Sequence, residues 1–317
     1  MKTWLTDRFD LSVPLVGAPM FGVGGGRLAA AISAAGALGM IGTGRTTTPQ
    51  WLRDEAALAA AGGRPYGIGL MAWALDIDDA VLAPTLEARP ALVSVSFGDI
   101  GPYVEALHAA GIAVASQAGN LAEAKAAAQA GVDVLVVRGG EAGGHGRNEV
   151  STLPLLQVVL DEVDLPVIAA GGLSGARGLA AVLAAGAVGG WAGTAFLTCV
   201  EADTSDEAVA RLSAAAETQT AYGRVFDVGQ RLDWPPEFGG RALRNDFFDR
   251  WDGRESELGD ADVAELAAAK TARDFDAAYI YAGQGVGALH DRRAAADVVA
   301  DFAAADGLIA AAARRLS

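Results

Sequence analysis

The feature that most constrains the fold of this chain is a regular alternation of short apolar runs with alanine-rich segments. Eight apolar runs can be counted, at residues 14–18, 38–42, 66–70, 92–95, 113–116, 134–137, 166–169 and 189–192. The segments between them favour amphipathic helices, as in NLAEAKAAAQA at 120–130 and GARGLAAVLAA at 175–185. Buried strands separated by helices are typical of a parallel sheet. Because an open doubly wound sheet usually has fewer strands, eight repeats predict a closed (β/α)₈ TIM barrel.

The periodicity changes after the eighth run. We expect a helix over 205–219, an irregular stretch over 220–240 and another helix over 261–269. The predicted organisation is a barrel over 1–200, a helical or irregular insertion over 201–275, and a C-terminal segment over 276–317 that packs back on the barrel. The irregular stretch is rich in aromatic residues and proline: Tyr222, Phe226, Trp234, Pro235, Pro236 and Phe238. Such a connection indicates a lid or a pocket lining, with a simple packing loop as the alternative.

The composition excludes several classes of partner. The 317 residues are 52% hydrophobic and carry a net charge of -15, which argues against contact with nucleic acid. The one cysteine, Cys199, excludes an intramolecular disulfide, and we expect it to be a buried, unreactive thiol. Asp7, Arg8 and Asp10 interrupt the N-terminal region where a signal peptide would need an unbroken apolar stretch. A cytoplasmic protein is therefore expected.

Residues 178–200 hold no charge and are long enough to suggest a membrane span. Their composition is mostly alanine and glycine, and the sequence GAVGGWAGT interrupts any helix halfway. A helix, a turn, a buried strand and a loop explain the segment better, so no membrane partner is expected.

The most informative loop follows the sixth run and reads RGGEAGGHGR at 138–147. Its glycines clear side chains from around Glu141 and His145, which is unfavourable in backbone entropy unless something approaches the chain closely. Of the three histidines, His108 is expected on a helix and His290 near the C-terminal end. An imidazole at the mouth of a barrel suits general-base catalysis, so His145 is the candidate catalytic residue. A histidine that only stabilises the loop is the alternative.

Glycines also follow the last two runs, as Gly171 and Gly172 in one loop and as Gly193 before Thr194 in the other. Free N–H groups at helix starts bind anions, and in TIM barrels these two loops commonly hold a phosphate. A phosphate-bearing cofactor or substrate is therefore expected, with packing turns as the alternative. No P-loop, paired CxxC or HExxH sequence occurs, so no metal is expected.

These stretches together resemble the nitronate monooxygenase family, formerly called 2-nitropropane dioxygenases. The resemblance runs over residues 15–287 through PLVGAPM, EAGGH, AAGG, GT and YAGQGVG. It implies an FMN-binding barrel whose glycine loops hold the FMN phosphate, with Ala18, Pro19 and Met20 beside the isoalloxazine ring. It also implies oxidation of alkyl nitronates by O₂ to carbonyl compounds and nitrite. His145 matches the family's catalytic histidine, which takes the α-proton from neutral nitroalkanes.

Three positions depart from the family pattern, which usually has Asn in place of Gly69 and Gln in place of Arg138 and Trp191. Arg138 still supplies donors and a fixed positive charge, whereas Gly69 and Trp191 cannot reproduce amide hydrogen bonds. The residues expected at the cofactor are Ala18, Pro19, Met20, Gly69, Arg138, Gly143, Gly171, Gly172, Trp191, Gly193 and Thr194.

Two other functions stay open. The EAGGH loop also occurs in flavin-dependent enoyl-acyl-carrier-protein reductases, so an NAD(P)H-dependent reductase of an enoyl-thioester is the first alternative. A non-enzymatic protein that binds flavin or another small ligand is the second. The expected partners are a small-molecule substrate and O₂, and a homodimer is left open.

Overall fold

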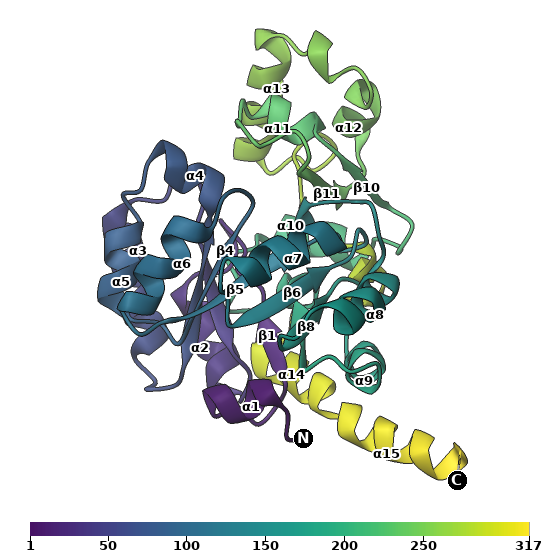
Figure 1. Cartoon of the computed structure of the whole chain (residues 1–317). Helices are drawn as coiled ribbons and strands as arrows, with labels where there is room; N and C mark the ends of the chain where they lie inside the picture. Colours follow the sequence, from purple (N-terminus) through teal and green to yellow (C-terminus); the bar gives the residue numbers. More distant parts are fainter. Residues whose placement is uncertain (317) are drawn as a thin grey trace.

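The computed structural model describes residues 1–316, and eight parallel strands form its core (Figure 1). They are β1 (Leu15–Gly17), β2 (Gly39–Gly42), β3 (Tyr66–Met71), β4 (Leu92–Ser96), β5 (Ala113–Ala118), β6 (Val134–Arg138), β8 (Val167–Ala170) and β9 (Gly189–Ala192). Hydrogen bonds join them in the order β1-β9-β8-β6-β5-β4-β3-β2, and a parallel bridge between Val16 and Leu38 joins the two ends of the sheet. The predicted TIM barrel is confirmed, and each apolar run forms one of its strands.

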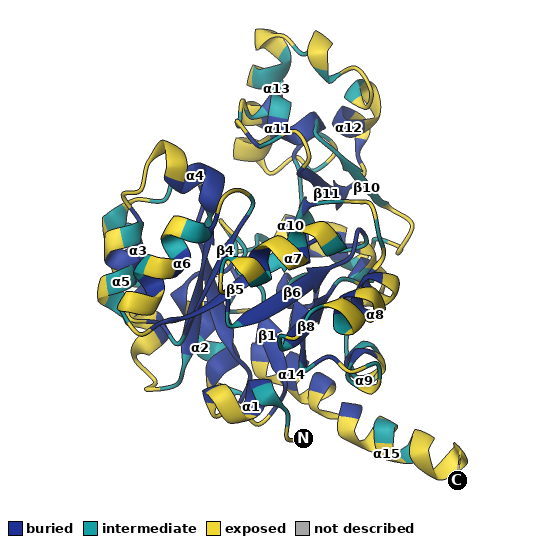
Figure 2. Ribbon diagram, viewed as in Figure 1, coloured by how far each residue is buried: buried dark blue, intermediate teal, exposed yellow. Residues whose placement is uncertain are grey.

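Helices surround the barrel and alternate with its strands (Figure 1). They are α2 (Gly26–Ala34), α3 (Pro49–Ala60), α4 (Ala72–Ile77), α5 (Leu82–Ala88), α6 (Gly101–Ala109), α7 (Leu121–Gln129), α8 (Thr152–Glu162) and α9 (Ala176–Ala184). Their inner sides are buried and their outer sides exposed (Figure 2). This one-sided burial is what an amphipathic helix achieves against a sheet.

The barrel interior is a separate apolar cluster from the layer under the helices. Along β6, Val134 and Val136 belong to the interior cluster, whereas Leu135 and Val137 belong to the outer layer. This alternation follows from the two-residue period of a strand. The helix α1 (Trp4–Phe9) adds buried apolar side chains to the interior cluster and so closes one end of the barrel.

The insertion lies between β9 and the helix that completes the barrel, α14 (Ala295–Ala303), which contacts α2 and α9. It contains η1 (Thr194–Phe196), α10 (Asp206–Ser213), β10 (Thr220–Gly223), α11 (Val225–Gly229), β11 (Gly239–Leu243), α12 (Asp246–Trp251), η2 (Glu255–Glu257), α13 (Asp260–Ala272) and η3 (Gln284–Ala288). We call residues 220–282 the lobe, which stands apart from the barrel helices in Figure 1. The last helix, α15 (Ala305–Leu316), contacts α9 and α14.

The expectation of an irregular stretch over 220–240 is wrong. It contains β10, α11 and the start of β11, and β11 also pairs with a further strand, β7 (Gly144–Gly146). These strands are short and rich in glycine, so local preference does not indicate them, and their pairing depends on residues distant in sequence. The helix expected over 205–219 ends early, at Ser213. The helix expected over 261–269 is present as α13, which is longer and runs from Asp260 to Ala272.

Within residues 1–316, no helix has the length and hydrophobicity needed to cross a bilayer. The uncharged stretch at 178–200 contains most of α9, then β9 and η1, as its composition indicates.

Candidate active site

His145 lies on the strand β7, although a loop was expected there. Its backbone pairs with Gly240 of β11, and the flanking residues Gly144 and Gly146 have φ angles of +73° and +153°. Such backbone angles strongly favour glycine, which explains two of the glycines around this histidine. His145 is thereby held by the sheet of the lobe at the carboxyl end of a barrel strand.

The imidazole of His145 is bound to a buried carboxylate. Its Nε2 lies 2.7 Å from Oδ1 of Asp227, a residue of α11 that is 1% exposed. The hydroxyl of Tyr281 donates to the same oxygen at 3.3 Å. Burial, together with the charge of Asp227, raises the pKa of Tyr281 well above its ordinary value, so the hydroxyl stays a donor. The other imidazole nitrogen, Nδ1, has no partner within the described residues.

Asp227 is a site residue that the sequence reasoning missed. It lies in the stretch that was expected to be irregular, more than eighty positions from His145. One signal was present, because Val225, Phe226 and Val228 place this acid in an apolar segment. A carboxylate in such surroundings is rarely buried without a partner.

Trp234 covers one face of His145. The two rings stack with centroids 3.8 Å apart and planes 2° apart. The indole of Trp234 also lies 5.0 Å from Trp73 and 5.3 Å from Phe97, and Phe238 lies 5.3 Å from Phe97. These aromatic rings form a wall that joins the lobe to the ends of β3 and β4.

Arg138 is buried at the end of β6, and it organises the backbone of the segment that carries His145. One guanidinium nitrogen donates to the carbonyl oxygens of Ala142, Gly143 and Gly144 at 3.1, 3.1 and 2.8 Å. Burial lowers the pKa of Arg138 to about 10, so the group stays positively charged at neutral pH. The departure from the family's usual glutamine thus supplies a buried cation that holds this turn in place.

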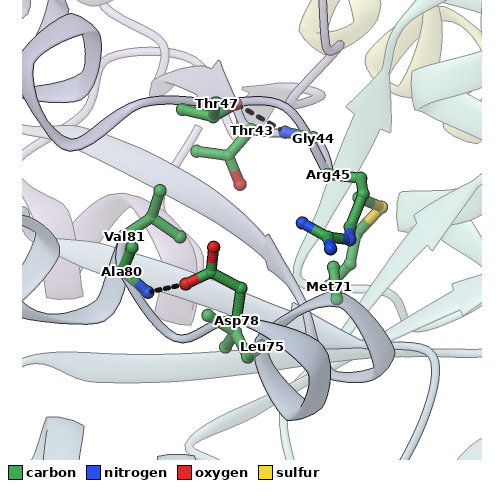
Figure 3. A pocket seen from close by; sticks show the side chains of 10 residues that line it. Thr43, Gly44, Arg45, Thr47, Met71, Leu75, Asp78, Ala80 and Val81 are labelled. Carbon is green, nitrogen blue, oxygen red and sulfur yellow. Dashed lines mark hydrogen bonds between the residues drawn. The ribbon is translucent and has the colours of Figure 1, made fainter.

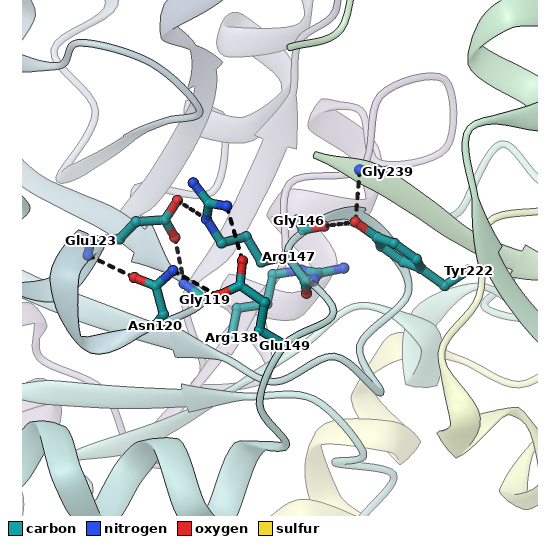
Figure 4. Close-up of polar contacts among 9 residues, drawn as sticks. All are labelled: Gly119, Asn120, Glu123, Arg138, Gly146, Arg147, Glu149, Tyr222 and Gly239. Carbon is teal, nitrogen blue, oxygen red and sulfur yellow. Dashed lines mark hydrogen bonds and ion pairs between the residues drawn. The ribbon is translucent and has the colours of Figure 1, made fainter. Parts of the chain in front are cut away.

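Further polar contacts hold β7 and the residue that follows it (Figure 4). The hydroxyl of Tyr222 donates to the carbonyl of Gly146 and accepts from the N–H of Gly239, both at 2.8 Å. Arg147 forms ion pairs with Glu123 and Glu149. The histidine segment is therefore fixed to α7 on one side and to the lobe on the other.

Pro19 fills the space beside Gly69. A Cβ atom added to Gly69 would lie 2.4 Å from two carbons of the Pro19 ring, closer than carbon atoms can approach. The absent asparagine therefore leaves no gap here, because the loop of Ala18, Pro19 and Met20 lies directly against β3. This loop is where the resemblance places the flavin ring.

Trp191 points into the barrel, where it packs in the interior cluster with Val16, Ile168 and Ala170. It is 4% exposed, and Ala18 packs against the same cluster. Trp191 thus supports the Ala18 loop from below rather than offering an amide to a ligand.

The glycine loops after β8 and β9 present free donors. The N–H groups of Gly172, Gly193 and Thr194 donate no hydrogen bond to any described residue. Gly171 and Gly172 have φ angles of +120° and +68°, and Gly175 precedes α9. Free N–H groups on neighbouring strand ends are the donor set that a phosphate needs, so these residues fit the expected FMN phosphate.

One expectation about these loops is wrong. Gly193 and Thr194 were expected to open a helix, but they open only η1, a single 3₁₀ turn of three residues. The Thr194 hydroxyl accepts a hydrogen bond from the N–H of Gly283 at 2.9 Å. Gly143 lies against the same segment, since an added Cβ would lie 2.4 Å from the Gly283 nitrogen. The YAGQGVG motif therefore joins the EAGGH segment to the end of β9.

A pocket lies apart from His145, between the loop after β2 and α4 (Figure 3). The side chains of Arg45 and Asp78 approach it from opposite sides, and Met71 lines this pocket and also packs against the aromatic wall. None of the predicted site residues lines it.

The other histidines and the cysteine lie outside the site. His108 is bound to Asp133 on the outer surface at 2.9 Å, and His290 is exposed. Cys199 is fully buried, and burial raises the pKa of its thiol to about 12. The thiol is thus buried and protonated at neutral pH, as expected.

Comparison with known families identifies the family to which this TIM barrel belongs. The nitronate monooxygenase family model matches residues 2–304. The chain belongs to the nitronate monooxygenase family. It is a flavin-dependent oxidoreductase built on a TIM barrel.

Individual proteins and solved structures are similar to this chain over different shares of its length. A nitronate monooxygenase of Paraburkholderia phytofirmans is 31% identical, over 95% of this chain and 94% of that protein. A 5-hydroxy-7a-methyl-1-oxo-octahydro-1H-indene-4-carboxyl-CoA dehydrogenase of Rhodococcus jostii is 35% identical, over 72% of this chain and 64% of that protein. Among solved structures, FabK from Thermotoga maritima has a TM-score of 0.87 at 26% identity, covering 100% of both chains. Nitroalkane oxidase from Streptomyces ansochromogenes has a TM-score of 0.82 at 30% identity, covering 99% of both.

Proposed function

We propose that this protein is an FMN-dependent enzyme that oxidises alkyl nitronates, and the nitroalkanes from which they form, with O₂ to carbonyl compounds and nitrite. The observation that carries the proposal is the imidazole of His145 bound to the buried carboxylate of Asp227. A histidine oriented by a buried carboxylate can act as a general base that takes a proton from carbon. Membership of the nitronate monooxygenase family supports the choice of substrate.

In this proposal Asp227 accepts the Nε2–H of His145, which leaves Nδ1 as the basic nitrogen. Nδ1 takes the α-proton of a neutral nitroalkane, and the charge of Asp227 stabilises the imidazolium that forms. Arg138 holds the carbonyl groups of the preceding turn, so the imidazole stays in one orientation. A preformed nitronate needs no such proton transfer.

The N–H groups of Gly172, Gly193 and Thr194 would bind the FMN phosphate, and the loop of Ala18, Pro19 and Met20 would lie beside the ring. Bound FMN would accept electrons from the substrate and pass them to O₂. The aromatic wall around Trp234 excludes water from this side of the imidazole.

An NAD(P)H-dependent reductase of an enoyl-thioester is the second candidate. It is favoured by the sequence similarity to the Rhodococcus jostii CoA dehydrogenase and by the structural similarity to FabK. Both functions act on a planar group that carries an oxygen acceptor, and one barrel fold hosts both kinds of chemistry.

The visible spectrum of the purified protein, followed by anaerobic mixing, separates the functions. We expect bound FMN, fast bleaching of its absorbance by propyl-2-nitronate, and slow bleaching by NADH or NADPH. Fast bleaching by a nicotinamide with none by the nitronate would favour the reductase. A colourless protein that takes up no added FMN would contradict both functions.

A further inference from the structure

Buried polar atoms without partners gather around Trp234. Five side-chain atoms of the described residues are buried with no hydrogen-bond partner: Trp73 Nε1, Thr204 Oγ1, Arg224 Nε, Asp227 Oδ2 and Trp251 Nε1. Three of these atoms belong to residues that contact either Trp234 or His145, whose imidazole stacks on Trp234. Trp73 packs on its ring, Arg224 donates to its carbonyl oxygen at 3.0 Å, and Asp227 binds the imidazole. Such atoms are rare in folded proteins, and their gathering at one place indicates a ligand site.

Trp73 supplies the donor with the clearest geometry. The residue is 7% exposed, and its backbone N–H donates to the carbonyl of Phe97 at 3.1 Å, which fixes the start of α4. The indole N–H can only donate a hydrogen bond. No described residue offers it an acceptor. A fixed, buried donor of this kind is complementary to an oxygen atom that is not part of the protein.

The indole of Trp234 contacts both the ring of Trp73 and the imidazole of His145. One side of the Trp234 ring stacks on the imidazole, and the ring of Trp73 lies 5.0 Å from its centroid. The main chain of Trp234 is held by Arg224, so the indole can leave by rotation of its side chain while the segment stays in place. Rotation would leave a flat space bordered by His145, Trp73 and the aromatic rings of Phe97 and Phe238.

We propose that Trp73 is a substrate-binding residue whose Nε1–H donates a hydrogen bond to an oxygen of the substrate's nitronate group when Trp234 turns aside. The inference rests on the proposed function. Loss of the α-proton places negative charge on the two nitro oxygens, and a preorganised donor binds that charge more strongly than it binds the neutral nitroalkane. The aromatic wall takes the alkyl part of the substrate, so the preferred nitronates carry apolar chains.

Trp73→Phe tests the donor because it removes the N–H and keeps an aromatic ring. Trp251→Phe is the matched control, since Trp251 in α12 also has a buried Nε1 without a partner but packs against the apolar core of the lobe. The probe is isobutyrate, a non-reacting carboxylate with the same heavy-atom connectivity and the same two-oxygen anionic group as propyl-2-nitronate. It is titrated against the FMN-loaded protein and followed by its effect on the flavin spectrum. The thermal midpoint and the FMN content of each variant show whether it is folded and loaded.

We expect Trp73→Phe to raise the Kd of isobutyrate and the KM of propyl-2-nitronate roughly tenfold, as for the loss of a hydrogen bond to a charged group. The FMN content of Trp73→Phe should match that of the wild type. The Kd of isobutyrate and the KM of propyl-2-nitronate for Trp251→Phe should also match the wild-type values. In the wild-type protein, the indole ¹⁵N–H resonance of Trp73 should move when isobutyrate is added.

Three results would overturn the inference: both constants within twofold of the wild type, an equal loss in Trp251→Phe, or a loss of FMN in place of a loss of isobutyrate affinity. A wild type that turns over no nitronate, yet binds isobutyrate in a Trp73-dependent way, contradicts the proposed function alone and leaves Trp73 as the donor to a planar oxyanion. A wild type that binds neither compound contradicts both.

Discussion

Nε2 of His145 lies 2.7 Å from Oδ1 of Asp227, so a carboxylate of the lobe orients the imidazole that follows a barrel strand. The strand that carries His145 is itself part of the lobe's three-stranded sheet. The imidazole and the carboxylate are thus fixed to one another by β11 and α11, and their separation does not depend on how the lobe sits on the barrel.

Asp227→Asn should lower kcat with neutral nitroalkanes by roughly 10²-fold, because the amide can still accept from Nε2 but carries no charge to stabilise an imidazolium. FMN content should not change. Tyr281→Phe, which removes the other donor to the same oxygen, is the control and should reduce kcat less. The kcat values of both variants are measured by steady-state kinetics with a nitroalkane and with its nitronate. Equal kcat values of Asp227→Asn and the wild type with a neutral nitroalkane would show that Asp227 has no role in proton transfer.

Trp234→Ala should change the KM for nitronates while the flavin stays bound, because the indole covers the imidazole and borders the proposed substrate space. The change should depend on the length of the alkyl chain, since the lost ring belongs to an apolar wall. The measurement is KM for a series of 1-nitroalkane nitronates. If no substrate shows a different KM, the Trp234 segment serves packing only.

Gly172→Asp should abolish retention of FMN, because it places a negative charge at the proposed phosphate site. Gly172→Asn is the matched control. Both side chains are tolerated better than most at a φ of +68°, and they differ in charge. The flavin content of the purified variants, compared with their thermal midpoints, gives the result. Equal FMN retention in the two variants would place the phosphate elsewhere.

Gly69→Asn restores the family's usual residue, yet we expect it to destabilise the protein, because its Cβ would overlap the Pro19 ring. The thermal midpoint should fall, and the double variant Gly69→Asn with Pro19→Ala should recover part of the loss. Differential scanning fluorimetry on the four proteins measures this coupling. A single variant as stable as the wild type would show that Pro19 moves freely.

The barrel could be predicted from the sequence because its strands are local apolar runs and its helices are amphipathic. The positions of Gly172, Gly193 and Thr194 at strand ends follow from the same pattern. The strands β7, β10 and β11 could not be predicted from the sequence. Gly144, Gly239 and their neighbours have little preference for a strand, and they pair with residues distant in sequence.

The hydrogen-bond partner of His145 could not be predicted either, because it also depends on contacts between residues distant in sequence. Asp227 approaches the imidazole only because β11 pairs with β7, and no local signal links the two positions. Trp234 was singled out by its prolines and aromatic neighbours, but its stack on the imidazole depends on that same pairing. Arg138 was read as a donor to a ligand, whereas its hydrogen bonds are to backbone carbonyls of the next turn.

The most direct test of the account is the activity of His145→Asn toward a neutral nitroalkane and toward its preformed nitronate. Asparagine is similar in size and can donate to Asp227, so fold and FMN content should be kept. We predict a loss of roughly 10²-fold or more with the nitroalkane, the usual scale for a general base, and a far smaller loss with the nitronate, whose proton is already gone. The same proportional loss with both compounds would contradict the account, and His145 would then orient the substrate or the flavin without removing a proton.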